Sequence, residues 1–254
     1  MSTLTNIYRA IQQSLQRSEP EVWTPDVVGK RQHVREIHLA SISPDVKPPL
    51  IIGLHGYGIN EMQMKTLVNV QLNQPFIYLA PRAPYIHPTG GYAWFPVDSI
   101  SNGDKGREFH VDPASVQSSL QLIAELIPLA VERYQADPNR VFIIGYSQGA
   151  AMSIAFMLSH PELLAGGAAM SGQLLDEAKS LASKARNGNP ARESKPFFLG
   201  YGTKDPFITQ SDMLNTIAFM ESGGVNVTYH EYPIPHVVSQ QQLRDLERWI
   251  LPYC

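Results

Sequence analysis

Ser147 stands between two glycines in the segment Gly-Tyr-Ser-Gln-Gly, residues 145–149. The apolar residues 141–144 come directly before this segment, and the small residues 150–152 follow it. The apolar run predicts a buried strand, and the residues after the serine predict a helix that packs closely against it. A serine at the sharp turn between them projects its hydroxyl from the sheet and can attack a carbonyl carbon. The alternative is an ordinary turn with an exposed serine.

Two backbone N–H groups are candidates to bind the negatively charged oxygen that such an attack creates. Gln148 begins the predicted helix, where N–H groups lack intrahelical partners, so its N–H is the first candidate. The second is the N–H of Tyr57, which lies between Gly56 and Gly58 in the loop after the predicted strand 50–54. The two glycines allow the backbone to approach a ligand closely.

The same loop contains a histidine and a predicted helix start. His55 precedes Ser147 in the chain, so we interpret it as a structural residue that holds the loop through hydrogen bonds, and not as the base. Asn60 is the predicted N-cap of the next helix, and Gln63, three residues later, is predicted to complete a capping box.

His236 is the predicted base that removes the proton of the serine. Where serine, acid and base follow one another in this order along the chain, the histidines late enough are His230 and His236. His230 falls inside the predicted strand 225–232, whereas His236 lies in the loop beyond it, which Pro233 and Pro235 stiffen. The base is therefore assigned to His236, and an exposed loop histidine is the alternative.

Asp205 is the predicted acid that orients the histidine. It comes directly after the predicted strand 196–202, whereas Asp176 and Asp212 fall in or beside predicted helices. An aspartate before a proline also forms turns without any chemical role, and Asp205 precedes Pro206, so a turn residue is the alternative.

Strands that alternate with helices must position these side chains. The expected strands are 33–40, 50–54, 76–79, 141–144, 163–171, 196–202 and 225–232, and the expected helices are 4–15, 61–72, 112–131, the one after Ser147, 174–185, 211–221 and 240–251. This alternation predicts an α/β protein with a mainly parallel sheet and helices on both faces. We expect one domain over residues 1–254, with residues 1–25 as an N-terminal helical extension, and a Gly/Pro-rich connection over 81–111.

Composition excludes several classes of function. Hydrophobic residues make up 43% and charged residues 17% of the 254 residues, which supports a large core. The net charge is −3 and no basic run occurs, so no nucleic-acid partner is expected. The single cysteine is Cys254, which excludes an internal disulfide and a thiolate metal site. No His/Asp/Glu cluster has metal-ligand spacing, so we expect no metal site.

The chain also lacks the patterns of membrane and secretory proteins. No basic segment followed by a long apolar stretch occurs at the N-terminus, and no run of 18 apolar residues occurs anywhere. The expectation is a cytoplasmic protein without a transmembrane segment that acts on a small molecule. A homodimer is left open.

Several short motifs occur in the order known from one family: Leu-His-Gly-Tyr-Gly at 54–58, Ala-Pro-Arg-Ala-Pro at 80–84, Ala-Trp-Phe at 93–95, Gly-Tyr-Ser-Gln-Gly-Ala at 145–150, Gly-Thr-Lys-Asp at 202–205, and His236. The chain thus resembles the phospholipase/carboxylesterase family of the α/β-hydrolase fold, which includes acyl-protein thioesterases and small bacterial carboxylesterases. The resemblance implies a cofactor-free serine hydrolase of carboxylic esters or thioesters. The chain departs from the family pattern at Tyr201 and at Pro235, where the family usually has histidine and glycine.

The resemblance also implies that Trp94 and Phe95 lie beside the site of the acyl group, although a position in the core fits them equally well. Together with Tyr85 and Tyr92 they are expected to wall a compact pocket. We therefore predict a serine carboxylesterase for short- to medium-chain esters that uses Ser147, His236 and Asp205. The alternatives are an acyl-protein or acyl-CoA thioesterase, a lysophospholipase, and a non-catalytic binding protein on the same fold.

Overall fold

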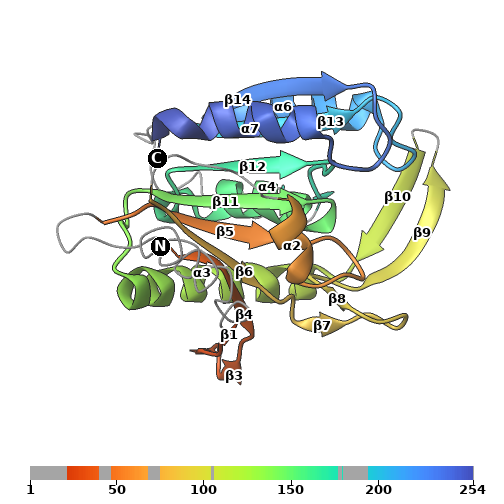
Figure 1. Cartoon of the computed structure of the whole chain (residues 1–254). Helices are drawn as coiled ribbons and strands as arrows, with labels where there is room; N and C mark the ends of the chain where they lie inside the picture. Colours follow the sequence, from red (N-terminus) through yellow and green to blue (C-terminus); the bar gives the residue numbers. More distant parts are fainter. Residues whose placement is uncertain are drawn as a thin grey trace, which may run out of the picture.

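A mixed sheet of eight strands forms the centre of the protein, in the order β1-β4-β6-β5-β11-β12-β13-β14 (Figure 1). The structure is a computed structural model that describes residues 22–39, 47–67, 75–103, 106–176, 179 and 194–253. The predicted N-terminal helix 4–15 lies outside the described residues, and so does most of the predicted helix 174–185.

Neighbouring strands from β6 to β14 run parallel, and the first two strands run antiparallel to their neighbours. The strands are β1 (Val22–Trp23), β4 (Val34–Leu39), β5 (Leu50–Leu54), β6 (Ile77–Pro81), β11 (Val141–Tyr146), β12 (Gly166–Met170), β13 (Lys195–Gly202) and β14 (Val225–Tyr232). The predicted mainly parallel sheet is confirmed.

Helices cover both faces of the sheet, which explains why the central strands are continuous apolar runs. Successive residues of a strand point to opposite faces. Ile52 belongs to the core on the face that α3 (Pro113–Tyr134), α4 (Gln148–Ser159) and α6 (Gln210–Ser222) cover, and Ile51 belongs to the core on the face of α2 (Met62–Leu67) and α7 (Gln240–Ile250). Figure 1 shows α2 and α7 in front of the sheet and α3 and α4 behind it.

Helix α3 begins as predicted. The Asp112 side chain accepts a hydrogen bond of 3.0 Å from the N–H of Ala114, and Pro113 occupies the first turn. By length and composition alone α3 is apolar enough to cross a membrane, although it contains no run of 18 consecutive apolar residues. One of its sides is buried against the rest of the core, including Val116, Leu120 and Ile127, so α3 serves as a core helix.

The connection 81–111 is more regular than predicted. It contains two antiparallel hairpins, β7 (Tyr85–Ile86) with β8 (Tyr92–Ala93) and β9 (Val97–Gly103) with β10 (Gly106–Val111). Glycines in this stretch suggested loops, but Gly90 and Gly91 have positive φ and form the turn of the first hairpin. A third pair, β2 (Asp26–Val27) and β3 (Lys30–Arg31), was also missed. The described residues also contain two 3-10 turns, η1 (Pro161–Leu163) and η2 (Leu251–Tyr253). Because η1 includes Leu163, the first residue of the predicted strand 163–171, β12 begins only at Gly166.

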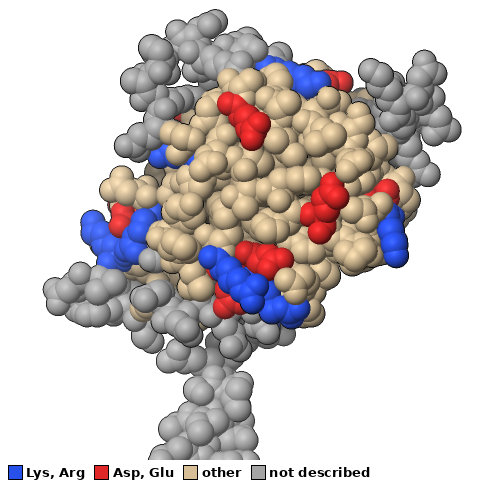
Figure 2. Space-filling view, turned by 90° about the horizontal axis from the view of Figure 1, so that it is seen from above, with Lys and Arg blue, Asp and Glu red and all other residues tan. Residues whose placement is uncertain are grey.

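Charged side chains of both signs are interspersed on the face seen from above (Figure 2). Among the residues coloured there, blue and red groups lie mostly next to one another and form no continuous field of one sign. The formal net charge of −3 agrees with this mixture.

Two glycines let α4 approach the sheet closely. A Cβ on Gly145 would lie 2.0 Å from the carbonyl oxygen of Gly149, and a Cβ on Gly149 would lie 2.1 Å from that of Leu54. Both neighbours are backbone atoms, which cannot move away without shifting a strand or a helix. The turn between β11 and α4 therefore requires glycine at both positions.

Replacing Gly149 by alanine is expected to destabilise the protein by about 3 kcal/mol or more, the upper range for overpacking of a core. The matched control is Gly29→Ala, because Gly29 has open space around it and only its positive φ of 68° opposes a side chain. That control is expected to cost about 1 kcal/mol. Urea unfolding measures both values, and an equal loss in the two variants would contradict the steric argument.

Candidate active site

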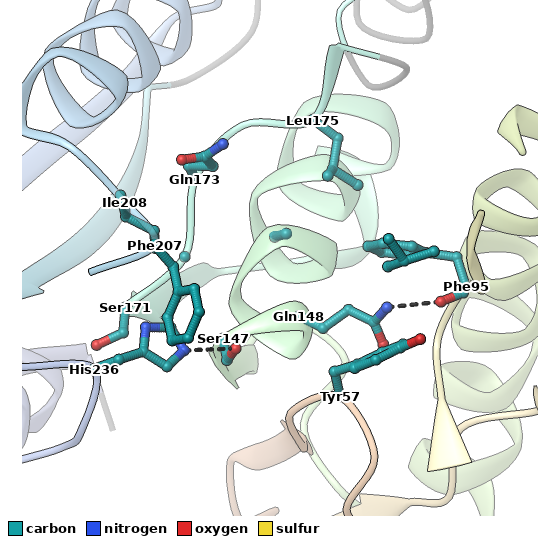
Figure 3. Close-up of a pocket in the computed structure, with 13 residues that line it drawn as sticks. Tyr57, Phe95, Ser147, Gln148, Ser171, Gln173, Leu175, Phe207, Ile208 and His236 are labelled. Carbon is teal, nitrogen blue, oxygen red and sulfur yellow. Dashed lines mark hydrogen bonds between the residues drawn. The ribbon is translucent and has the colours of Figure 1, made fainter. Parts of the chain in front are cut away.

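Ser147, His236 and Asp205 come together at the carboxyl edge of the sheet, in the loops that follow β11, β14 and β13. The Oγ of Ser147 lies 2.9 Å from Nε2 of His236 (Figure 3). Nδ1 of the same histidine lies 2.6 Å from Oδ2 of Asp205. A neutral imidazole has one N–H, so the N–H on Nδ1 donates to Asp205 and Nε2 accepts from the serine hydroxyl. The structure thus brings the three predicted residues into one chain of hydrogen bonds.

The backbone of Ser147 is strained. Its φ is 54° and its ψ is −117°, a conformation that L residues rarely adopt. The conformation persists because the close packing of α4 on β11 and a 3.0 Å hydrogen bond from the N–H of Ser147 to the carbonyl of Met170 hold the turn. The hydroxyl is thereby directed away from the sheet and toward His236.

The carboxylate of Asp205 is held from two sides. Its side chain is fully buried, and while Oδ2 accepts from His236, Oδ1 accepts from the N–H groups of Phe207 and Ile208 at 2.8 and 3.2 Å. Tyr201, one of the departures from the family pattern, donates a hydrogen bond of 3.3 Å from its hydroxyl to the carbonyl of Ile208. The acid loop is therefore fixed at both ends.

The loop of His236 is also fixed. The Tyr146 hydroxyl donates a 2.8 Å hydrogen bond to the carbonyl of His236, and the Phe207 ring packs edge-on against the imidazole with centroids 5.1 Å apart. The N–H of Val237 donates to the carbonyl of Pro235, which closes a tight turn around the histidine. His230, the alternative base, lies in β14 and stacks on Phe198 instead.

Tyr57 and Gln148, the residues predicted to supply the oxyanion donors, line the same pocket as Ser147 (Figure 3). Gln148 is the first residue of α4, so its N–H has no intrahelical partner, and the N–H of Tyr57 has no hydrogen bond within the described residues. A Cβ on Gly56 would lie 3.5 Å from the Cβ of Ser147, which places the loop of Tyr57 directly beside the nucleophile.

Hydrogen bonds from buried side chains shape that loop. His55 donates from Nδ1 to the carbonyl of Gly56 at 2.8 Å, and its Nε2 accepts from the N–H of Ala83 at 3.1 Å. Burial lowers the pKa of His55, which keeps this tautomer neutral. The predicted structural role of His55 is confirmed. The predicted capping box is wrong: Oε1 of Gln63 accepts from the N–H of Gly56 at 2.9 Å, and Asn60 alone caps the helix, at the N–H of Met62.

A buried ion pair behind the loop was not predicted. Glu61 is 1% exposed and accepts two hydrogen bonds from the guanidinium of Arg82, at 2.9 and 2.7 Å, while that guanidinium also packs over the ring of Tyr92. Burial opposes ionisation of Glu61, but the hydrogen bond and charge of Arg82 outweigh it and hold the pKa of the carboxyl below its ordinary value. Arg82 lies in the motif Ala-Pro-Arg-Ala-Pro at 80–84, which was the sequence signal that pointed to this position.

Trp94 and Phe95, predicted as a pair beside the pocket, take different positions. Trp94 is fully buried in the core, where its Nε1 donates a 2.9 Å hydrogen bond to the carbonyl of His55, and only Phe95 lines the pocket. The Gln148 side chain holds both. Its Oε1 accepts from the N–H of Trp94 at 2.7 Å, and its Nε2 donates to the carbonyl of Phe95 at 2.7 Å (Figure 3). Sequence reasoning missed this contact.

A pocket of about 440 Å³ opens at Ser147. Its lining is mainly apolar and consists of Tyr57, Phe95, Val97, Ser147, Gln148, Ala151, Ser171, Gly172, Gln173, Leu175, Phe207, Ile208 and His236. Tyr85 and Tyr92, predicted to wall the pocket, do not line it; they lie in the hairpin of β7 and β8. Phe207 and Ile208 line the pocket instead. Their position two and three residues after Asp205 was the sequence signal that could have placed them at the site. Among the described residues no group of side chains is arranged to hold a metal ion.

Comparison with known proteins places the chain among esterases. Residues 39–252 match the family described as Phospholipase/Carboxylesterase. The chain is 28% identical to Carboxylesterase SOBER1 of Arabidopsis thaliana over 211 residues, 79% of this chain and 88% of that protein. It is 26% identical to Acyl-protein thioesterase 1 of Debaryomyces hansenii over 233 residues, 86% of this chain and 97% of that protein.

Solved structures show the same fold. The crystal structure of the Bacillus cereus carboxylesterase superposes with a TM-score of 0.68 at 21% identity, over 88% of this chain and 95% of that one. That of Arabidopsis thaliana SOBER1 superposes with a TM-score of 0.67 at 23% identity, over 81% and 99%. The predicted α/β-hydrolase fold is confirmed.

Changing Glu61 to glutamine is expected to lower the free energy of unfolding by about 3 kcal/mol at neutral pH, because it leaves the Arg82 charge without its buried partner. A group whose pKa is lowered on folding stabilises the protein above its ordinary pKa, here 4.5, and loses that effect as the pH falls through the lowered value. The difference between wild type and E61Q should therefore shrink in acid. Exposed Glu221→Gln is the control, with a change within about 0.5 kcal/mol. A difference that stays constant with pH would contradict this account.

Proposed function

Since the chain belongs to the phospholipase/carboxylesterase family, we propose that this carboxylic ester hydrolase works through an acyl-enzyme formed on Ser147. The observation that carries the proposal is the continuous hydrogen-bond chain from Asp205 through His236 to Ser147, at the mouth of an apolar pocket. A protein that only binds ligands has no need for a buried carboxylate aimed at a histidine and a serine in a strained turn.

In the first step, Oγ of Ser147 attacks the carbonyl carbon of the ester while Nε2 of His236 takes the hydroxyl proton. The C=O electron pair moves to the carbonyl oxygen, and the N–H groups of Tyr57 and Gln148 bind the resulting oxyanion. His236 becomes a cation beside the Asp205 carboxylate. That carboxylate stabilises the cation and, through the hydrogen bond at Nδ1, holds the ring in the tautomer that presents Nε2 to the serine.

In the second step, the oxyanion re-forms the C=O bond and the bond to the alcohol oxygen breaks. His236 returns its proton to that oxygen, the alcohol departs, and the acyl group stays on Ser147. Water then repeats the sequence: His236 removes one of its protons, the hydroxyl adds to the acyl carbon, and Ser147 leaves with the proton. No step uses a cofactor, and the substrate is a small-molecule ester.

The pocket supports acyl groups of short to medium length. Each methylene buried against its apolar walls gains about 0.8 kcal/mol, but only until the pocket is full. The second candidate is a thioesterase, which the likeness to Acyl-protein thioesterase 1 favours. A thioester presents the same carbonyl carbon to Ser147, so the leaving group and the chain length distinguish the two candidates.

Replacing His236 by alanine is expected to reduce kcat by a factor of about 10⁴ or more, as removal of a triad base does. The matched control is His230→Ala, which removes a histidine six positions earlier whose ring stacks on Phe198. It should keep most of the activity. Both variants should retain the circular dichroism spectrum of the wild type. If His230→Ala lost activity and His236→Ala kept it, His230 would be the base and the assignment to His236 would be wrong.

A panel of oxygen esters and thioesters with acyl chains from acetyl to palmitoyl tests the substrate class. We expect kcat/KM for the oxygen esters to rise with chain length, to pass through a maximum at short or medium chains and then to fall, because longer chains no longer fit the pocket. No rate jump is expected when the substrate exceeds its solubility. A steady rise up to palmitoyl, with thioesters preferred, would favour the thioesterase instead.

A further inference from the structure

Two glutamines line the pocket, and they differ in their hydrogen bonds. Both ends of the Gln148 amide are bonded, to Trp94 and Phe95. The Gln173 amide makes no hydrogen bond with any described residue, and its Oε1 is buried without a partner. The other enclosed polar side chains of the lining belong to the reaction or, like Ser171, reach a backbone carbonyl. Gln173 is therefore the one enclosed polar side chain of the described lining without a bond or a role.

The segment that carries Gln173 is held rigidly. Ser171 is fully buried, has a φ of 53°, and donates a 3.0 Å hydrogen bond from its N–H to the carbonyl of Gly200. Gly172 lies so close to α4 that a Cβ there would meet the Cβ of Ala150 at 2.3 Å. Beyond Gln173, the N–H of Leu174 donates to Oγ1 of Thr216 at 3.0 Å. The backbone that carries the amide is thus held in place before any ligand arrives.

The surroundings of this amide make its lack of partners costly. Its neighbours in the lining include the apolar side chains of Leu175 and Ile208, which offer no hydrogen bonds. A carbonyl oxygen that is buried without a partner loses its hydration without compensation, and a ligand group that pairs with it recovers the loss. The buried atom of Gln173 is Oε1, which only accepts, so the ligand group must donate; a hydroxyl group can do so and a keto oxygen cannot.

The acyl half of the substrate is the part that reaches this wall. The alcohol must receive its proton from His236 and then depart, whereas the acyl group stays on Ser147 inside the pocket until water arrives. Ile208 and Phe95 of the lining are 6% and 3% exposed, so the pocket offers enclosed apolar wall for that acyl group. Figure 3 shows the amide of Gln173 away from Ser147, so it would meet the chain of the acyl group and not its carbonyl.

We propose that Gln173 makes the pocket select acyl groups that carry a hydroxyl group along the chain over plain alkanoyl groups of the same length. The inference rests on the proposed esterase function and specifies its substrate class. An apolar pocket discriminates weakly between chains that differ by one polar group, whereas a site with a waiting hydrogen-bonding group rejects the analogue that leaves it unpaired.

The test compares esters of one alcohol in matched pairs: pentanoyl with 5-hydroxypentanoyl and hexanoyl with 6-hydroxyhexanoyl, and, as a pair that adds only an acceptor, hexanoyl with 5-oxohexanoyl. Each ratio of kcat/KM is divided by the ratio of the hydroxide-catalysed rates, which removes the intrinsic reactivity. We expect the wild type to favour at least one hydroxylated partner by about tenfold without the same preference for the keto partner, and Gln173→Met to lower the hydroxyl ratio by about three- to tenfold, the effect of one hydrogen bond. Gln173→Leu provides the same comparison if the methionine variant does not fold.

Leu175→Met is the matched control, because it reshapes the neighbouring wall without changing its polarity, and it should leave the ratio unchanged. A wild-type ratio near one, a preference that survives in both Gln173 variants, or a preference that follows oxygen atoms in the alcohol half would overturn the inference. These results leave the proposed function intact as long as the plain esters are hydrolysed. Failure of the wild type to hydrolyse any ester would instead overturn the proposed function.

Discussion

The close approach of α4 to the strands β5 and β11 is the constraint on which the site depends. The backbone at Gly149 lies against the carbonyl of Leu54, in a space that a single methyl group would fill. This contact sets the sharp turn that strains Ser147, exposes the N–H of Gln148 at the helix start and brings the loop of Tyr57 beside the nucleophile. Three parts of the proposed reaction, the nucleophile and both oxyanion donors, thus follow from one packing contact between backbones.

Around this contact, polar side chains hold each loop from behind. His55 and the pair of Glu61 and Arg82 fix the loop of Tyr57, and the Gln148 side chain ties the segment of Trp94 and Phe95 to the start of α4. His55, Glu61 and Gln148 are buried and Arg82 is half-buried, and each is hydrogen-bonded, so a change in one leaves its partner unpaired. Gln173 departs from this pattern, which is why it is the candidate for contact with the substrate.

Much of this arrangement could be predicted from the sequence, because it depends on local patterns. Apolar runs identified the central strands, and the chain order of Ser147, Asp205 and His236 identified residues that the structure brings within hydrogen-bonding distance. The rest depends on contacts distant in the sequence. The hairpins of 81–111, the burial of Trp94 and the bond of Gln63 to Gly56 arise from neighbours that no local pattern encodes, and a glycine in a hairpin turn looks like a glycine in a loop.

The most direct test of the account is to locate the covalent intermediate. The wild type is treated with an alkyl phosphonate ester, digested and examined by mass spectrometry, and Ser147→Ala is treated in parallel. The account predicts one phosphonyl group per chain, on the peptide that contains Ser147, with complete loss of esterase activity and no label on the alanine variant. A stoichiometric label on another residue, or ester turnover that survives full labelling of Ser147, would contradict it.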